Sequence, residues 1–369
     1  MKEPRVAIIS PNRSAWSETF VRAHIERLPG VELVLMDDHL PRRDADGAPL
    51  LSDTLRARLV RRVRGIGPES ALRRAVTERL RRARIEVVFA EYGPTGDAML
   101  PICRELDIPL VVQFHGVDAY HEKLLREHDG YTALLKGAAA ILVVSREMER
   151  HVIALGADPS KVVHNVCGID LDRFRPGRPE QADKTFLFVG RFVDKKAPQL
   201  VVLAFARALE SDQWLRLRML GDGPLLESVR QMIGALGIEG SVELLGVGSP
   251  EEVAAEMARS RALVQHSVTT ASGDREGTPV AVMEAMAAGL PVIATRHAGI
   301  ADVVVHETSG LLCEERSIDV MAGHMVRLAT EPDQAARMGA EGRRIAERDL
   351  RLDDRIDTIH LTLLRSVGR

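Results

Sequence analysis

Short apolar runs alternate with helical stretches along almost the whole chain. Several of these runs are nearly continuous in apolar residues, which is typical of parallel strands covered by helices on both faces. The alternation predicts a doubly wound α/β architecture, and five expected strands in each half predict two Rossmann-like domains rather than one large sheet. The expected strands are Arg5–Ile9, Val31–Met36, Ile85–Ala90, Leu110–Phe114, Ala140–Val144, Thr185–Val189, Leu215–Leu220, Val242–Leu245, Ala262–His266 and Pro291–Thr295.

The expected domain boundary lies in residues 173–183, where prolines, a glycine and several charges give the composition of a linker. We therefore expect an N-terminal domain over residues 1–172 and a C-terminal domain over residues 184–348. Residues 349–369 should form a final helix that packs back toward the N-terminal domain, because their apolar positions keep helical spacing. A cleft between two α/β domains is the default place for a ligand.

Composition narrows the possible classes of protein. The 369 residues are 45% hydrophobic and 28% charged, the ordinary globular mixture, which excludes a disordered, collagen-like or coiled-coil chain. A net charge of −3 argues against a dedicated nucleic-acid binder. Three widely spaced cysteines cannot form a disulfide framework and favour a reducing compartment. The first apolar run is too short for a signal peptide, and we expect a cytoplasmic protein without a membrane span.

One segment differs from the rest in charge. From Arg56 to Arg84 there are eleven arginines and two glutamates, an excess of nine positive charges. Apolar residues keep helical spacing there, and Gly65, Gly67 and Pro68 interrupt them. Two interpretations stay open: a pair of solvated helices packed by one face, or a surface that attracts anionic lipid headgroups or an anionic acceptor.

The first candidate for chemistry is a helix entry. Pro279 is expected as the first helical residue with Thr278 as its N-cap, and Gly277 allows close approach to the backbone. The free N–H groups of such a turn suit a phosphate. Glu276 lies at the mouth of this site and Glu284 about 7.5 Å along the helix at ~1.5 Å per residue, which suits a diphosphate between two polyols. The alternative is a capped helix with solvated glutamates. Against it, Glu284 lies among apolar residues and should have a partner.

Three further candidates follow expected strands, at the edge where α/β proteins bind ligands. Arg191 and Lys196 follow the strand ending at Val189 and could hold a diphosphate and stabilise a departing phosphate, although solvated loop charge is the alternative. His115, followed by a glycine, ends another strand and is either functional or structural. Gly221 and Gly223 form a turn that either touches a nucleoside or is purely structural.

Taken together in chain order, these four candidate segments resemble those of the retaining glycosyltransferases of family four, which have the GT-B fold. The strongest element is the Glu-x7-Glu pair, and the next is Gly190-Arg191 with Lys196. His115-Gly-Val-Asp118 matches the family's acceptor-domain histidine motif, and Gly299-Ile-Ala-Asp302 matches a Gly-x-x-Glu element. Ser17-Glu-Thr-Phe20 and Gly273-Asp-Arg-Glu-Gly277 are similar to exopolysaccharide enzymes of the colanic-acid type.

The resemblance implies that residues 1–172 form the acceptor-binding domain and residues 184–348 the nucleotide-sugar donor-binding domain. It also implies roles for individual residues. Arg191 and Lys196 would bind the donor diphosphate, Glu276 the donor sugar and Glu284 the ribose, and His115 would lie against the sugar at the reaction centre. The implied catalytic residues are His115, Arg191, Lys196 and Glu276. The implied donor-binding residues also include Gly221, Gly223, Gly277, Thr278, Pro279, Val280 and Glu284. The implied acceptor-side residues are Ser17, Glu18, His115 and Asp118.

The sequence departs from the family pattern at a few positions. Ala197 replaces the usual glycine after the lysine, and Asp302 shortens the usual glutamate. The loop from Ser10 to Ser17 lacks the common glycine pair, so the resemblance does not imply phosphate contacts there.

The resemblance implies transfer of a hexose, with retention, from a nucleotide diphosphate sugar to a hydroxyl acceptor. A uridine donor is favoured and GDP-mannose is the alternative. A polysaccharide or lipid-linked glycan precursor is the expected acceptor, and no metal or other cofactor is implied. Other interpretations are a GT-B nucleotide-sugar hydrolase or phosphorylase, a small-molecule natural-product glycosyltransferase, and a non-catalytic scaffold. An NAD-dependent oxidoreductase is disfavoured, because no G-x-G-x-x-G follows the first strand.

Overall fold

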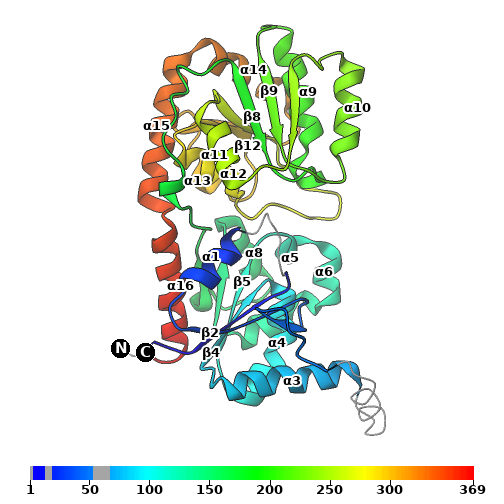
Figure 1. The fold of residues 1–369 in the computed structure, drawn as a ribbon, viewed down its shortest axis with the longest axis vertical. Coiled ribbons are helices and arrows are strands. Elements are labelled where there is room, and N and C mark those ends of the chain that lie inside the picture. Colours follow the sequence, from blue (N-terminus) through cyan, green and yellow to red (C-terminus); the bar gives the residue numbers. More distant parts are fainter. Residues whose placement is uncertain (1–2, 13–18, 53–66) are drawn as a thin grey trace. The chain divides into compact units, whose positions relative to one another are not determined.

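A computed structural model describes residues 3–12, 19–52 and 67–369 of the chain. These residues divide into unit 1, residues 1–166 with 353–369, and unit 2, residues 167–352. Each unit is built around one β-sheet with helices packed against it (Figure 1). The predicted fold class, two Rossmann-like α/β sheets, is confirmed. The expected linker, residues 173–183, falls inside unit 2.

The sheet of unit 1 has seven strands in the order β3-β2-β1-β4-β5-β6-β7. All neighbours are parallel except β2 and β3. The strands are β1 (Val6–Ser10), β2 (Val31–Met36), β3 (Arg43–Asp44), β4 (Val87–Glu91), β5 (Leu110–Phe114), β6 (Ala140–Val143) and β7 (Val162–His164). The helices are α1 (Thr19–Arg27), α3 (Pro68–Arg82), α4 (Gly93–Leu106), α5 (Val117–Tyr120), α6 (Glu122–Glu127), α7 (Thr132–Gly137) and α8 (Arg146–Ala154), with short 3-10 turns η1 (Asp129–Tyr131) and η2 (Pro159–Lys161).

The sheet of unit 2 has six parallel strands in the order β10-β9-β8-β11-β12-β13. The strands are β8 (Thr185–Val189), β9 (Arg216–Leu220), β10 (Val242–Gly246), β11 (Ala262–Gln265), β12 (Val292–Thr295) and β13 (Gly310–Cys313). The helices are α9 (Pro198–Leu209), α10 (Leu226–Leu236), α11 (Pro250–Ala258), α12 (Val280–Ala287), α13 (Ile300–Val303), α14 (Ile318–Thr330) and α15 (Pro332–Asp349), with 3-10 turns η3 (Leu171–Arg173) and η4 (Asp194–Lys196). The last helix, α16 (Leu352–Ser366), begins in unit 2 and lies mainly in unit 1.

All ten expected strands are present, with ends that differ by at most two residues. The sheets have seven and six strands, more than the roughly five expected in each half, because β3, β7 and β13 were missed. β3 has two residues and β7 three, and β13 begins at a glycine, so none of them carries a run of β-favouring residues long enough to be recognised.

The central strands are buried on both faces, which explains their apolar runs. Every residue of β1, β4 and β5 is buried. Polar residues occur mainly where the strands end, and Glu91 and Gln113 are such positions in β4 and β5. In unit 1 the chain passes from β1 to β2 on one side and later to β4 on the other side of β1. The carboxyl edge of the sheet at such a switch point is where α/β proteins bind ligands.

No helix among the described residues is both long enough and apolar enough to span a membrane. The three cysteines, Cys103, Cys167 and Cys313, are buried free thiols. Residues 56–66, the first part of the arginine-rich stretch, lie outside the described residues.

Candidate functional site

An ion pair joins two of the predicted donor-site residues in unit 2. Nζ of Lys196 lies 2.9 Å from Oε1 of Glu276, and the two side chains are only 12% and 9% exposed. Burial alone would raise the pKa of Glu276, but the positive charges of Lys196 and Lys195 hold it at about 2. The pair is therefore charged at neutral pH and lies at the carboxyl edge of the sheet.

The stem of Lys196 passes close to the backbone at Gly190. A Cβ on Gly190 would lie 2.7 Å from Cδ of Lys196, so a larger residue there would displace the lysine side chain. The short turn η4 ends at Lys196, and Ala197 then adopts φ 39° and ψ 54°, a left-handed conformation that favours glycine. Arg191, in the same loop, is exposed; its carbonyl accepts from the N–H of Val193 at 3.0 Å, and its side chain makes no hydrogen bond or ion pair with the residues that the structure describes.

The turn containing Gly221 and Gly223 packs directly on the Arg191 loop. The N–H of Phe192 donates to the carbonyl of Asp222 at 2.9 Å. A Cβ on Gly221 would lie 1.9 Å from the carbonyl oxygen of Gly190, and one on Gly223 would lie 2.6 Å from that of Phe192. These contacts supply a structural reason for both glycines, so their spacing does not by itself require a ligand.

A histidine and a glutamate that the sequence interpretation missed hold the Glu276 loop. The backbone N–H of Glu276 donates to Nε2 of His297 at 3.2 Å, and Nδ1 of His297 lies 2.7 Å from Oε1 of Glu315. Since Nε2 accepts, the ring proton is on Nδ1 and is donated to Glu315. His297 could have been recognised from its position in the sequence. It follows the strand β12 and precedes a glycine turn, just as His115 follows β5.

The prediction that Thr278 caps the following helix is wrong. Helix α12 begins at Val280, Pro279 occupies the N-cap position, and no side chain caps the first turn. The physical reason is the turn at Gly299, whose N–H donates to the carbonyl of Gly277 at 2.9 Å. A Cβ on Gly299 would lie 2.0 Å from Oγ1 of Thr278, so the hydroxyl packs against this glycine.

Glu284, in the middle of α12, is a partly buried carboxylate. Burial raises its pKa to about 7, and the charges of Arg173 and Lys196 oppose that rise only in part. Among the described residues no side chain or backbone group hydrogen-bonds to this carboxylate, contrary to the expectation that it has such a partner. A carboxylate in this state is ready to accept hydrogen bonds from a ligand's hydroxyls.

In unit 1, His115 belongs to a buried cluster that the sequence did not reveal. Glu91 ends the strand β4 and has no exposed surface; its carboxylate lies 2.7 Å from Nε2 of His115 and 2.6 Å from Nδ1 of His24. Burial would raise the pKa of Glu91, but the two histidines hold it at about 2. The rings of Phe20 and Tyr92 pack on His115, with centroids at 4.5 and 4.6 Å. Glu91 could have been recognised from the sequence, because it ends an apolar strand and is followed by Tyr92 and a glycine.

Asp118 of the His115-Gly-Val-Asp118 motif organises the turn of that histidine. Its Oδ1 accepts from the N–H groups of His115 and Gly116 at 3.0 and 2.9 Å, and its Oδ2 accepts from the N–H of Gly93 at 2.9 Å. The buried carboxylate therefore ties the end of β5 to the start of α4. Ser17 and Glu18, the other predicted acceptor-side residues, lie outside the described residues.

The described part of the chain contains no group of three or more His, Cys, Asp or Glu side chains arranged to hold a metal ion.

Two family models together match most of the chain. Residues 24–173 match the model described as "Glycosyltransferase Family 4", and residues 170–345 match "Glycosyl transferases group 1".

Sequence relatives agree with these matches. The glycosyltransferase WcaL of Escherichia coli, named for colanic acid biosynthesis, is 31% identical over 274 residues, which are 72% of this chain and 67% of WcaL. A GDP-mannose-dependent alpha-(1-6)-phosphatidylinositol monomannoside mannosyltransferase of Mycobacterium tuberculosis is 31% identical over 187 residues, which are 48% of this chain and 49% of the relative. The chain thus spans about two thirds or less of the length of these relatives.

The fold agrees with that of solved glycosyltransferase structures. The crystal structure of HepE from Anabaena, in complex with UDP, superposes with a TM-score of 0.79 and 15% identity, over 98% of this chain and all of HepE. At this identity the likeness shows the fold alone. With the sequence relatives, it means that the chain belongs to glycosyltransferase family 4, a family of retaining enzymes with the GT-B fold.

Proposed function

We propose that the protein transfers a hexose from a nucleotide diphosphate sugar to a hydroxyl of a polysaccharide or lipid-linked glycan precursor, in the cytoplasm and for exopolysaccharide biosynthesis. The observation that carries the proposal is the Lys196–Glu276 ion pair beside the unpartnered carboxylate of Glu284. These three groups match the parts of such a donor. The cation suits the diphosphate, the charged carboxylate suits the sugar, and the second carboxylate, which has no hydrogen-bond partner, suits the ribose.

On the donor side, Lys196 and the exposed Arg191 contact the diphosphate. Charge-assisted hydrogen bonds from these two cations stabilise the negative charge that develops as the nucleoside diphosphate departs. Glu276, oriented by its backbone contact with His297, accepts from hydroxyls of the donor sugar. Glu284 accepts from the ribose hydroxyls, which supply the hydrogen bonds that it lacks.

The transfer itself needs no protein nucleophile. The acceptor hydroxyl attacks the anomeric carbon from the face on which the diphosphate leaves, and an oxygen of the leaving phosphate takes the hydroxyl proton. The chain's own residues act through position and charge. His115, whose ring is fixed by Glu91, Phe20 and Tyr92, lies against the donor sugar in this proposal.

A uridine donor is the first choice and a guanosine donor the second. HepE, which shares the fold, was crystallised with UDP, whereas the mycobacterial relative is named for its dependence on GDP-mannose. The exopolysaccharide assignment takes its support from WcaL, which is named for colanic acid biosynthesis.

Lipid contact by the stretch from Arg56 to Arg84 is a separate part of the proposal. Its support is the local excess of nine positive charges. Within α3, however, Arg73, Arg79, Arg81 and Arg82 are already paired with carboxylates, which weakens the field that this helix presents. Co-sedimentation with liposomes tests the contact: binding should require anionic lipid and weaken with salt, and equal recovery with neutral liposomes excludes it.

A thermal-shift screen of nucleotide sugars tests the donor assignment. A ligand stabilises the folded state according to its concentration relative to its Kd, so UDP-glucose or GDP-mannose should raise the melting temperature while free hexoses do not. Product analysis with and without glycan acceptors then separates a transferase from a nucleotide-sugar hydrolase or phosphorylase. Absence of a shift with every nucleotide sugar contradicts the proposal.

A further inference from the structure

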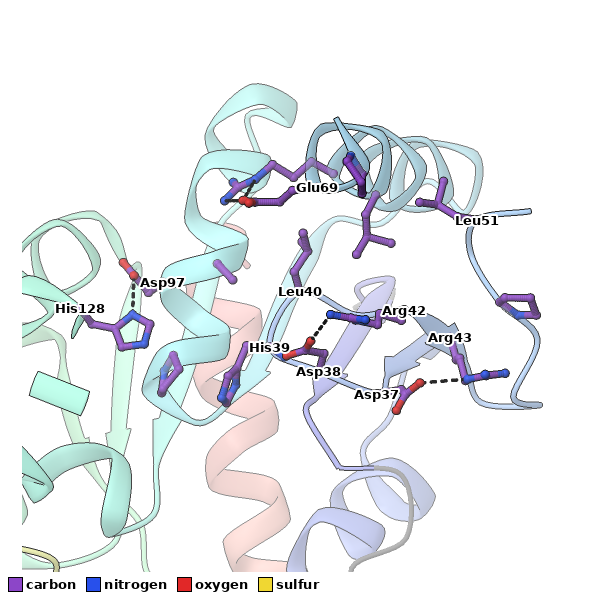
Figure 2. Close-up of a pocket in the computed structure, with 16 residues that line it drawn as sticks. Asp37, Asp38, His39, Leu40, Arg42, Arg43, Leu51, Glu69, Asp97 and His128 are labelled. Atoms are coloured by element: carbon purple, nitrogen blue, oxygen red, sulfur yellow. Dashed lines mark hydrogen bonds and ion pairs between the residues drawn. The ribbon is translucent and has the colours of Figure 1, made fainter. Parts of the chain in front are cut away.

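Unit 1 contains a cavity of about 870 Å³, lined by parts of residues 37–43, 49–51, 68–73 and 94–98 and by residue 128 (Figure 2). Ion pairs in its lining join Asp37 to Arg43, Asp38 to Arg42 and Glu69 to Arg73. The side chains of these pairs are between 37% and 73% exposed, so water screens their charges and they single out no ligand. A more deeply buried network of polar groups lies in unit 2, next to Glu276.

The carboxylate of Glu315, two residues after β13, accepts hydrogen bonds from residues that follow two other strands of the same sheet. Its Oε2 accepts from the backbone N–H of Thr269, after β11, at 2.9 Å, and its Oε1 accepts from the Thr269 hydroxyl at 3.1 Å. Oε1 also accepts from Nδ1 of His297, after β12, at 2.7 Å. Burial alone would raise the pKa of Glu315, but the hydrogen bonds from His297 and Thr269 hold it below its ordinary value. Glu315 is therefore ionised at neutral pH and accepts at both oxygens.

The turn that carries Glu315 is itself fixed to the end of β11. The N–H of Arg316 donates to Nε2 of His266 at 2.8 Å, and the guanidinium of Arg316 donates to the carbonyl of Thr269 at 3.0 Å. Burial lowers the pKa of His266 to about 4, so this ring is neutral and keeps its acceptor nitrogen. Glu315 thus has a defined place relative to the residues that follow β11 and β12.

His297 connects Glu315 to the backbone of Glu276. Because the proton on Nδ1 of His297 is donated to Glu315, Nε2 of the ring carries no proton and accepts from the N–H of Glu276 at 3.2 Å. The side chain of His297 is only 1% exposed, so water does not replace this contact. A ring with its proton on Nε2 would place a donor against the donor of Glu276 and displace that backbone.

A second contact holds the same loop without Glu315. Nζ of Lys195 lies 3.1 Å from Oδ1 of Asp274 and donates to the carbonyl of Arg275 at 3.3 Å. The loop should therefore stay folded when Glu315 is replaced, and the change should be confined to the place of Glu276 within it.

We propose that Glu315 is a positioning residue for the donor sugar. By fixing the ring of His297 with its proton on Nδ1, it holds Glu276 where that carboxylate accepts from the sugar hydroxyls. The inference rests on the proposed function, because it takes Glu276 as the contact of the donor sugar. It adds a residue whose effect is confined to the sugar half of the donor. Within the described part of the chain, the hydrogen bonds of Glu315 and His297 do not reach the residues assigned to the diphosphate and the ribose.

Calorimetric titration of the full chain with UDP, GDP, UDP-glucose and GDP-mannose tests the inference. In Glu315→Gln one amide oxygen replaces two carboxylate oxygens, so it cannot accept from both the N–H of Thr269 and Nδ1 of His297. This variant should bind the nucleotide sugar roughly 10-fold more weakly than the wild-type protein. It should bind the matching nucleoside diphosphate within about twofold of the wild-type protein. His297→Asn, which removes the ring acceptor of the Glu276 N–H, should show the same pattern and replaces Glu315→Gln if that variant does not fold.

The matched control is Glu314→Gln, at the neighbouring position. The side chain of Glu314 is 75% exposed and pairs with Arg296 at 3.5 Å, so the affinity for both ligands should not change. A cycle with Glu276→Ala then tests the route of the effect. Once the carboxylate of Glu276 is removed, Glu315→Gln should weaken the binding of the nucleotide sugar no further.

Equal losses of affinity for the nucleotide and the nucleotide sugar in Glu315→Gln, or a loss that persists in the Glu276→Ala background, overturn the inference and show a general structural role. Wild-type affinity for the nucleotide sugar in both Glu315→Gln and His297→Asn, where Glu276→Ala weakens it, overturns the inference alone. If Glu276→Ala itself binds the nucleotide sugar as the wild-type protein does, the proposed function fails and the inference fails with it.

Nitrogen NMR of the histidine rings tests the arrangement without any ligand. The signals of His297, identified by their absence in His297→Asn, should show the ring proton on Nδ1 in the wild-type protein. A proton on Nε2 overturns the inference, because such a ring cannot accept from the N–H of Glu276.

Discussion

One oxygen of the buried Glu91 carboxylate lies 2.7 Å from Nε2 of His115, and the other lies 2.6 Å from Nδ1 of His24. An ionised carboxylate can accept from both rings, whereas an amide supplies only one oxygen. Glu91→Gln should therefore release or reorient His115 and lower kcat by roughly 10- to 100-fold, the equivalent of about 1.5–3 kcal/mol for a charge-assisted bond. Steady-state kinetics should show this loss with little change in the KM for the donor.

The variant His24→Gln is the control for this prediction. It removes the other partner of Glu91 and leaves the contact with His115 in place, so it should cost stability but much less of kcat. If the two variants lower kcat equally, Glu91 acts through general stability and not through the orientation of His115.

Lys196 and Arg191, the two cations of the loop after β8, should affect the free energy of unfolding differently when each is replaced by alanine. Lys196→Ala leaves the carboxylate of Glu276 buried without its partner, so the free energy of unfolding should fall by about 3 kcal/mol. Arg191 is exposed, and Arg191→Ala should change it by less than about 0.5 kcal/mol. Both variants should bind nucleoside diphosphate roughly 10- to 100-fold more weakly. Wild-type nucleotide affinity in either variant excludes that residue from the diphosphate site.

Glu284 should make stability fall with rising pH. Its pKa is raised from 4.5 to about 7 in the folded protein, so between these values the folded state holds more protons than the unfolded state, and stability decreases as pH rises through this window. Glu284→Gln should remove this decrease and be more stable than the wild-type protein at pH 8, with the difference vanishing near pH 4. Urea unfolding across this pH range measures the effect, and parallel curves for the two proteins contradict it.

Because Ala197 has a left-handed conformation, replacing it by glycine should affect stability differently from most alanine-to-glycine substitutions. An alanine at φ 39° is strained by about 1 kcal/mol relative to glycine, which offsets the greater freedom of glycine in the unfolded chain. Ala197→Gly should therefore leave the free energy of unfolding unchanged or raise it. The control Ala204→Gly, at a buried position inside α9, should lower it by about 1 kcal/mol. Equal losses in both variants would show that position 197 carries no such strain.

The sequence predicts the strands that position the candidate site better than it predicts the contacts between the site's side chains. Continuous apolar runs are a local property, so ten of the strands and the residues that follow their carboxyl ends, such as His115 and Arg191, could be recognised without a structure. Contacts between distant segments leave no local pattern, which is why the bonds from Glu91 to His115 and from His297 to Glu276 were missed.

Two further differences have similar causes. The helix α12 begins after Pro279, where the Gly299 turn packs against Thr278, and neither the spacing nor the residue types around Thr278 reveal a turn that comes 21 residues later. The cavity of unit 1 is formed by five separate stretches of the chain whose charges pair only after folding, so its composition alone resembles ordinary solvated loops.

The most direct test of the donor site is a thermodynamic cycle between Glu284 and the ribose. Calorimetry measures the Kd of the cognate nucleoside diphosphate and of its 2′,3′-dideoxy form for the wild-type protein and for Glu284→Gln. If Glu284 accepts from the ribose hydroxyls, either change alone should weaken binding roughly 10- to 100-fold, and the second change should add little once the first is made. Losses that simply add, or a dideoxy nucleotide that binds the wild-type protein as tightly as the ribonucleotide, would contradict the account.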